Sequence, residues 1–258
     1  MKVTKPLVGR PCYVELSTSD TADAMRFYGG LFGWTAETDP RAEAGGYGMI
    51  KLGEAAIGGL SPLMQPDQPV AWTMSIGVTD ADASTEAVRQ AGGTVLAEPV
   101  DIFDSGRFSF VTDPTGAAFS LWQGRKFPGS ERIDEDGALV WTELATRDTK
   151  AARDFYTTVF GWTATDGDMG GETYTQWGLG GEDFGGMMDM AGHYPPEVPP
   201  NWLLYFGVPD VDATVAKADP LGGTIIVPAS DIPGTGRFAC LQDPQGAVFA
   251  VYHSTASS

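Results

Sequence analysis

The spacing of apolar residues near the start of the chain predicts a strand followed by a helix. Cys12, Val14 and Leu16 alternate with residues of the opposite face, which is the period of a half-buried strand. Asp20 is a typical helix N-cap and Gly33 a typical helix stop. Between them, apolar residues recur at the spacing of one helical face. These residues are Ala24, Phe27, Tyr28, Leu31 and Phe32.

This pattern occurs twice in the chain. Residues 11–34 read PCYVELSTSDTADAMRFYGGLFGW, and residues 139–162 read LVWTELATRDTKAARDFYTTVFGW. Three short strand-like segments separated by glycine follow the helix, and then a fainter version of the same order begins with a strand at 72–78 and a helix that Asp80 caps. The sequence of each half therefore predicts two units, and each unit contains one strand, then one helix, then three further strands.

The repeat also predicts the domain boundaries. The segment 124–137 is charged, contains proline and glycine and has no apolar period, so we interpret it as a linker between domains at 10–123 and 138–254. Near the end of each domain stands the same turn sequence, Asp-Pro-x-Gly, at 113–116 and 243–246. Proline and glycine at these positions suit a type I turn between antiparallel strands.

Composition narrows the range of partners. The net charge of −18 would repel nucleic acid and anionic lipid surfaces. No apolar run is long enough to span a bilayer and the start of the chain lacks the apolar segment of a signal peptide, so we expect a cytoplasmic protein. Cys12 and Cys240 do not occupy equivalent positions, and we interpret both as buried free thiols.

The strand, the Asp-capped helix with its Phe-Tyr pair and Phe-Gly-Trp ending, and the Asp-Pro-x-Gly hairpin together resemble the vicinal oxygen chelate superfamily of glyoxalases, extradiol dioxygenases and bleomycin-binding proteins. The resemblance covers nearly the whole chain. It implies an α+β fold of two tandem glyoxalase-like domains, each of two paired βαβββ units whose strands curl around a cup-shaped pocket. Because the superfamily hosts several reactions, the fold alone assigns none of them.

The resemblance also implies where a metal would bind, namely in the first strand of a unit, near the equivalent place in the partner unit, and in the last strand. These positions fall on Tyr13, Thr73 and Ser120 in the first domain and on Trp141, Leu203 and Ala250 in the second. A divalent site of this type needs imidazole and carboxylate ligands. The chain has only two histidines, His193 and His253, which we interpret as surface residues. We therefore expect no metal and no cofactor.

Two carboxylates remain at matched positions. Glu15 and Glu143 stand two residues after Tyr13 and Trp141, so strand alternation places them on the same face, toward the pocket. A carboxylate in an aromatic cup would be partly desolvated, which raises its pKa and suits a general base or a ligand hydrogen bond. The alternative is a glutamate that only holds neighbouring strands together.

Other matched residues are candidates for the pocket wall. Arg107 and Arg237 each follow a glycine at the start of a strand and could clamp an anionic or carbonyl group, pair with the nearby glutamates or brace the strand. Tyr47 and Tyr174 are matched across the halves and could line the cup or belong to the sheet. Further side chains expected to reach a cup are Ser120, Trp122, Tyr252, Trp72 and Trp202.

These features leave three functions open. The first is a monomer or homodimer that binds a small apolar or aromatic metabolite or drug in a metal-free pocket. The second is a metal-independent lyase, isomerase or hydroxylase-related enzyme that uses Glu15 or Glu143 as general base, with Arg107 or Arg237 stabilising an oxyanion. The third is a scaffold whose cups are vestigial. Metal-dependent glyoxalase or dioxygenase activity is not expected, because the ligand positions hold other residues.

Overall fold

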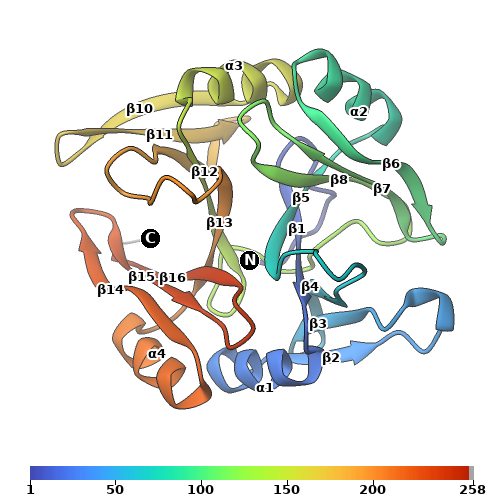
Figure 1. The fold of residues 1–258 in the computed structure, drawn as a ribbon, viewed down its shortest axis with the longest axis horizontal. Helices are drawn as coiled ribbons and strands as arrows, with labels where there is room; N and C mark the ends of the chain where they lie inside the picture. The colour runs from blue at the N-terminus through green and yellow to red at the C-terminus, as the bar shows by residue number, and fades with distance from the viewer. Residues whose placement is uncertain (256–258) are drawn as a thin grey trace.

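The computed structural model describes residues 1–255 and contains one eight-stranded mixed sheet for each half of the chain (Figure 1). The elements of the first half are β1 (Pro11–Thr18), α1 (Thr21–Phe32), β2 (Thr35–Thr38), β3 (Gly48–Leu52), β4 (Ala55–Pro62), β5 (Ala71–Gly77), α2 (Ala81–Gln90), β6 (Thr94–Ile102), β7 (Gly106–Thr112) and β8 (Ala118–Gly124). The first sheet has the strand order β2-β3-β4-β1-β5-β8-β7-β6.

The second half repeats this order. Its elements are β9 (Leu139–Thr146), α3 (Thr149–Phe160), β10 (Thr163–Met169), β11 (Glu172–Leu179), β12 (Glu182–Asp189), β13 (Asn201–Gly207), α4 (Val211–Ala218), β14 (Thr224–Ile232), β15 (Gly236–Gln242) and β16 (Val248–Ser254). The second sheet has the order β10-β11-β12-β9-β13-β16-β15-β14. The α+β fold with two βαβββ units in each of two tandem domains is thus confirmed.

The predicted helix ends are also confirmed. The Asp20 side chain accepts a hydrogen bond from the Asp23 backbone N–H at 2.9 Å, and α1 ends at Gly33, whose φ of 74° is left-handed. The second copy uses Asp148 and Gly161 in the same way for α3. These ends fix the direction in which the chain turns from each helix into the next strand.

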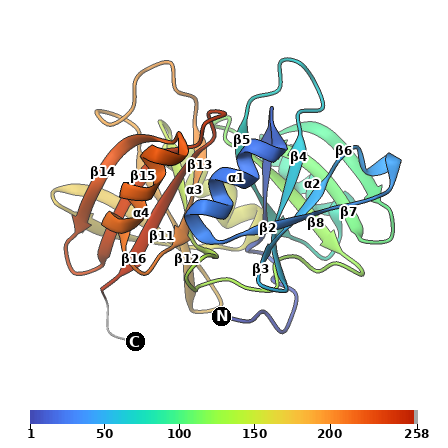
Figure 2. The ribbon, with the colours of Figure 1, turned by 90° about the horizontal axis from the view of Figure 1, so that it is seen from below.

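Within each domain, the two units meet through their first strands. In the first domain β1 pairs antiparallel with β5, and each of them pairs in parallel with the last strand of its own unit, β4 or β8. Figure 1 shows the sheet curling from β2 round to β6, while Figure 2 shows α1 and α4 side by side. The helices pack across the domains, α1 against α4 and α2 against α3. All four lie on the side of the sheets where the domains meet.

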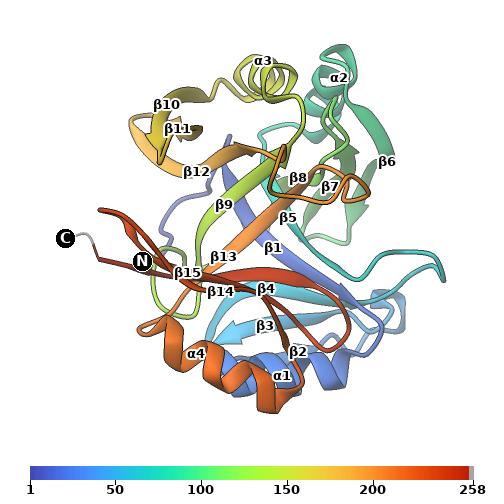
Figure 3. The same ribbon diagram turned by 60° about the vertical axis from the view of Figure 1, so that its left-hand side comes forward.

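The main hydrophobic core fills the space between the two sheets. It contains apolar side chains from both domains and from all four helices, and the central strands β5 and β13 contact each other there (Figure 3). Strand alternation sends Leu16 and Leu144 into this core, and it leaves the opposite face of each sheet free of helices. Two smaller aromatic clusters lie on those helix-free faces, one in each domain.

A reciprocal hydrogen-bond chain joins the domains inside this core. Trp72 donates its indole N–H to the Tyr28 hydroxyl at 2.8 Å, and Tyr28 donates to Asp243 of the other domain at 3.0 Å. The second copy repeats the chain from Trp202 through Tyr156 to Asp113, with two distances of 3.0 Å. The expectation that these two tryptophans reach a cup is therefore wrong, because alternation places them on the core face.

Asp113 and Asp243 each organise an Asp-Pro-x-Gly turn as well. Asp113 Oδ1 accepts backbone N–H groups of its own turn, among them those of Gly116 at 2.9 Å and Ala117 at 3.1 Å. Burial raises the pKa of both carboxyls, and the hydrogen bonds of the turn partly oppose that rise. The turn sequence is thus retained in both copies at a place where the domains hold each other.

The segment predicted as a linker connects β8 to β9 and is hydrogen-bonded to the first domain. Ser130 donates its backbone N–H to Cys12 O at 2.8 Å and its hydroxyl to Ile57 O at 2.9 Å. Earlier in the segment, the Phe127 ring packs edge-on against Tyr13, with ring centroids 5.1 Å apart. The linker therefore forms part of the wall of the first domain.

Replacement of Tyr156 by phenylalanine tests the reciprocal chain. The change removes the hydroxyl between Trp202 and Asp113 and leaves both buried groups without that partner, so we expect the free energy of unfolding to fall by about 1–3 kcal/mol. Urea denaturation measures it. Tyr252→Phe is the matched control, since the Tyr252 hydroxyl makes an exposed hydrogen bond to Thr235 O, and it should cost less than about 0.5 kcal/mol. Equal losses in the two variants would contradict a stabilising role for the chain.

Candidate functional site

The candidate sites are the helix-free faces of the two sheets. We call the face of the first sheet the first cup and that of the second sheet the second cup. The first cup is lined by Tyr13, Glu15, Tyr47, Met49, Thr73, Ser75, Phe108, Phe110, Ser120, Trp122 and Phe127. The second is lined by Trp141, Glu143, Tyr174, Leu203, Tyr205, Phe238, Cys240, Ala250 and Tyr252. Side chains directly opposite in paired strands share a face, which defines these sets.

The strand register shows which residues stand where a metal would be held. Tyr13 lies opposite Ser75, which lies beside Ser120. Thr73, the expected partner-unit position, lies opposite Glu15 on the same face. Hydroxyl side chains in this row do not make the imidazole and carboxylate set of a divalent site.

The corresponding row of the second cup is Trp141, Tyr205 and Ala250, which fits a metal no better. Within residues 1–255, no group of three or more His, Cys, Asp or Glu side chains could hold a metal ion. His193 instead pairs with Glu172 at 2.7 Å, and His253 Nδ1 lies 3.0 Å from Val208 O. The residues present thus do not fit the metal that the fold suggests.

Glu143 is the best-defined polar group of either cup. Its two carboxylate oxygens accept hydrogen bonds from Tyr174 at 2.9 Å and from Tyr205 at 3.0 Å. Trp141 donates its indole N–H to the Tyr174 hydroxyl at 2.9 Å. Burial raises the pKa of Glu143, and the two tyrosine hydroxyls partly offset the rise because they stabilise the anion. The structure thus brings together Trp141, Glu143 and Tyr174, as the sequence analysis expected.

Glu15 occupies the same place in the first cup with fewer tyrosine donors. Burial raises its pKa, while hydrogen bonding to Tyr47 and Ser61 lowers it in part. The Tyr47 hydroxyl lies 2.9 Å from that of Tyr13, which also reaches Met49 Sδ at 3.2 Å. Tyr13, Glu15 and Tyr47 therefore form one polar group within an otherwise apolar and aromatic cup.

A glycine opposite each glutamate makes room for the tyrosine. Gly59 pairs with Glu15 and Gly186 with Glu143. A Cβ atom at Gly59 would stand 2.1 Å from the Tyr47 hydroxyl, and one at Gly186 would stand 2.1 Å from that of Tyr174. The matched Gly-Gly pairs in β4 and β12 are the sequence signal that would have placed these tyrosines over the glutamates.

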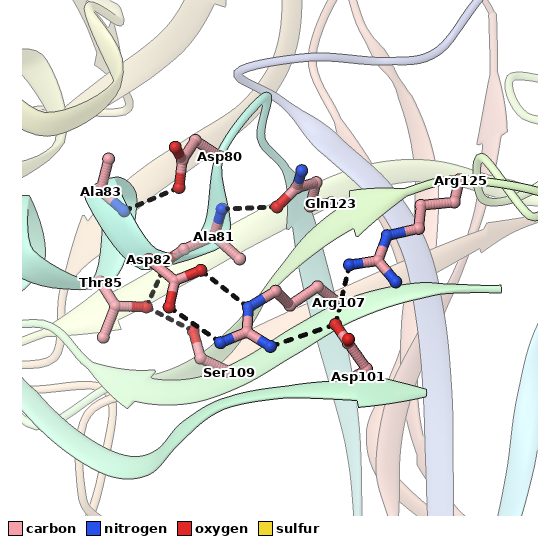
Figure 4. A network of polar contacts seen from close by, with 10 residues as sticks. All are labelled: Asp80, Ala81, Asp82, Ala83, Thr85, Asp101, Arg107, Ser109, Gln123 and Arg125. Atoms are coloured by element: carbon pink, nitrogen blue, oxygen red, sulfur yellow. Dashed lines mark hydrogen bonds and ion pairs between the residues drawn. The ribbon is translucent and has the colours of Figure 1, made fainter. Parts of the chain in front are cut away.

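The arginines lie outside the cups. Figure 4 shows Arg107 on the helix side of β7, where its guanidinium makes paired hydrogen bonds of 2.7 and 2.8 Å to Asp82 at the start of α2. A further bond of 3.1 Å joins it to Asp101. Arg237 is bound in the same way by Asp212 and Asp231. Neither arginine contacts a glutamate or faces a cup. Each is followed directly by a phenylalanine that faces the cup, and adjacent residues of a strand point to opposite faces of the sheet.

Other predicted wall residues do face the cups. Trp122 donates its indole N–H to Phe127 O at 2.9 Å, and Ser120 shares a hydrogen bond of 2.6 Å with Ser75. Tyr205 and Phe127 were not expected. Counting two residues along the strand from Leu203 would have found Tyr205, but the linker sequence gives no indication that Phe127 enters the first cup.

The structure also has buried thiols and a cavity away from the cups. Cys12 and Cys240 are free and buried, and burial raises the pKa of each thiol to about 12. A cavity of about 370 Å³ lies away from both cups, between the end of α1 and the start of α4, beside the exposed Lys217. No helix within residues 1–255 is long and apolar enough to cross a membrane.

Comparison with known proteins assigns the family. The sequence profile of the Glyoxalase/Bleomycin resistance protein/Dioxygenase superfamily matches residues 10–121 and 138–251. The chain belongs to this superfamily. Solved structures share this fold with the chain at low sequence identity. The Mn(II)-bound glyoxalase from Novosphingobium aromaticivorans has a TM-score of 0.66 at 17% identity, with 96% of this chain and 83% of that chain covered.

Two relatives of this superfamily member are similar along their length. "Putative glyoxylase CFP32" of Mycobacterium tuberculosis is 41% identical over 248 residues, which cover 94% of each chain. "Anthracycline biosynthesis protein DnrV" of Streptomyces peucetius is 35% identical over 263 residues, covering 96% of this chain and 94% of the relative. Both similarities span the two domains and the linker, so the tandem arrangement is shared.

Gly186→Ala should disturb the second cup of this superfamily member. The added methyl group would collide with the Tyr174 ring and push it away from Glu143, so we expect unfolding to become easier by about 1–3 kcal/mol. Gly167→Ala is the matched control in the same sheet, because its nearest neighbour would be Tyr174 O at 3.9 Å. Urea denaturation of both variants measures the difference. An alanine at 186 that is as well tolerated as one at 167 would argue against this packing.

The raised pKa of Glu143 predicts a pH dependence of stability. Between the unfolded and the folded pKa the folded protein holds the proton more tightly, so this residue's contribution to the free energy of unfolding falls as pH rises. Below the unfolded pKa nothing is lost, and above the folded pKa the loss is complete. The free energy of unfolding of the parent protein minus that of Glu143→Gln should therefore fall as pH rises above the ordinary pKa of a glutamate. Urea denaturation at a series of pH values measures it, and a flat or rising difference would contradict the assignment.

Proposed function

We propose that this protein binds a small apolar or aromatic compound in a cup, without a metal. The observation that carries the proposal is a glutamate held by tyrosine on an aromatic sheet face, with Glu15 and Tyr47 in one domain and Glu143 and Tyr174 in the other. Pockets for small molecules are commonly apolar with a few placed polar groups. The aromatic walls would cover the ring system of the compound, and a glutamate would orient it.

The electrostatics of the cups favour particular ligands. A carboxylate accepts hydrogen bonds and attracts positive charge, and the chain carries a net charge of −18. The arginines that could have attracted an anion are bound by aspartates on the opposite face. An uncharged or cationic compound is therefore favoured over an anion. The name of the relative DnrV supports the inclusion of anthracyclines among the compounds tested.

A second candidate function is catalysis of the lyase, isomerase or hydroxylase-related kind. It is favoured by the raised pKa of Glu15 and Glu143, since a carboxylate with a raised pKa is a better general base near neutral pH. With the arginines outside the cups, the hydroxyls of Tyr13, Tyr47 or Tyr174 would have to stabilise a developing oxyanion. The same cup would then hold a substrate instead of a ligand.

Tryptophan fluorescence tests binding, because Trp122 and Trp141 lie in the two cups. We expect saturable quenching by at least one compound of a panel that contains uncharged hydroxylated aromatics and an anthracycline. N-acetyltryptophanamide corrects for absorption of the exciting light by the compounds. If no compound of the panel quenches the protein more than it quenches this control, the proposal is contradicted.

Product analysis separates binding from catalysis. After incubation with a compound that quenches, mass spectrometry should recover that compound unchanged if the protein only binds it. Conversion by the parent protein, abolished in a folded Glu15→Gln/Glu143→Gln double variant, would support the second candidate instead. Conversion that persists in the double variant would exclude the glutamates as the base.

A further inference from the structure

We infer that the two cups have different roles, an inference that rests on the proposed function. The first cup is the binding cup, in which Glu15 accepts a hydrogen bond from an uncharged aromatic ligand. The second cup is a filled copy, in which Glu143 is a structural acceptor. The internal repeat makes the comparison direct, because each position of one cup has a counterpart in the other at the same strand register.

The glutamate of the first cup is more accessible than that of the second. Glu15 and the Thr73 side chain opposite it are both partly exposed. Their counterparts Glu143 and Leu203 are buried, with 8% and 6% of their surfaces exposed. A ligand can therefore reach the carboxylate of the first cup, whereas that of the second is covered.

The covering group in the second cup is a tyrosine that the first cup lacks. Tyr205 stands at the position of Ser75, and both side chains are 6% exposed. Tyr205 donates its hydroxyl to Glu143 at 3.0 Å, whereas the Ser75 hydroxyl forms a hydrogen bond of 2.6 Å with Ser120. The ring of Tyr205 thus covers Glu143, and Ser75 is too small to cover Glu15 in the same way.

The connectors before β5 and β13 differ as well. In the second domain, Arg147 donates to Pro195 O at 2.8 Å and to Val198 O at 3.2 Å, which holds the loop that carries Tyr194. Tyr194 lies close enough to Glu143 for the carboxylate to help raise the pKa of its hydroxyl, although burial is the larger cause. In the first domain, Met64 of the corresponding connector is 74% exposed. The connector of the second domain thus brings a partly buried side chain near Glu143.

The two glutamates differ in exposure more than in hydrogen bonding. The oxygens of Glu143 accept the hydroxyls of Tyr174 and Tyr205, and Glu143 is buried. Glu15 is hydrogen-bonded by Tyr47 and Ser61, and the Tyr47 hydroxyl also contacts that of Tyr13. A carboxylate has about four acceptor positions, so each glutamate keeps unused positions, but only Glu15 is partly exposed to a ligand.

The surroundings of Glu15 define the class of ligand. Phe108 and Phe110 are partly exposed on the cup face and offer ring contacts. Arg41 is held away from a ligand by its own contacts, since it stacks on Phe103 with its guanidinium carbon 3.8 Å from the ring centroid and pairs with Asp39. An aromatic hydroxyl compound fits this cup, because its ring meets the phenylalanines and its hydroxyl donates to Glu15.

Equilibrium dialysis against 1-naphthol, naphthalene and 1-naphthoate tests the inference with the whole chain. These probes share one ring system, and only 1-naphthol combines zero charge with a hydroxyl donor. We expect one 1-naphthol per chain, with at least about tenfold weaker binding of naphthalene and still weaker binding of 1-naphthoate. Glu15→Gln should weaken 1-naphthol binding about tenfold, whereas Glu143→Gln should change it less than about twofold.

Two variants place residues of the second cup at the matching positions of the first cup. Ser75→Tyr introduces the ring of Tyr205 and should abolish 1-naphthol binding, and Thr73→Leu should weaken it. Circular dichroism and urea denaturation establish that each variant is folded, and Thr73→Leu keeps the test open if the larger change does not fold. Two naphthols per chain, or a folded Glu143→Gln that loses as much affinity as Glu15→Gln, would overturn the division between the cups and leave the proposed function standing. Failure of the parent protein to bind any aromatic probe would instead reject the proposed function.

Discussion

The architecture depends on a buried exchange of hydrogen bonds between the domains. Each Asp-Pro-x-Gly aspartate accepts the hydroxyl of a helix tyrosine from the other half, so Tyr28 with Asp243 and Tyr156 with Asp113 complete each other. Buried polar groups are costly when they lack a partner, and neither domain alone supplies both members of a pair. The domains must therefore meet through their helix-bearing faces, which directs both cups outward.

This arrangement separates what the repeat must keep from what it can change. The core face is held by apolar packing and by the tyrosine and aspartate pairs, and both copies keep apolar residues there even where size differs, as at Ile50 and Trp177. On the cup face they keep the glutamate and its tyrosine, together with the Gly59 and Gly186 positions that admit the tyrosine ring. They differ at Ser75 and Tyr205, where a side chain meets the cup and no interdomain partner. The core thus keeps its apolar character in both copies, whereas the cup face changes in both size and hydrogen bonding at this position.

Local patterns predicted the helices, their caps and the cup-facing glutamates, because these depend on residues close together in sequence. Alternation from Thr73 also implied that Trp72 faces the core, a consequence that the sequence analysis did not draw. The face of Arg107 was harder to predict, because β7 begins just before it and only the register with β8 fixes which face its side chain takes. Tyr205 lay within reach of strand counting, but the entry of Phe127 into the first cup depends on the path of the linker in space.

Within residues 1–255, hydroxyl groups and no cation are the hydrogen-bond partners of the cup glutamates. In a metal site, a cation compensates a buried carboxylate, but the rows through Tyr13 and Trp141 supply no such ligand set. Hydroxyl donors do this instead, and they stabilise a carboxylate less than a cation would, which is consistent with the raised pKa of Glu143 despite two tyrosines. Glu15, which is partly exposed, can gain a further hydrogen bond from a ligand. The loss of metal ligands and the retention of a glutamate are therefore compatible with recognition of a neutral donor.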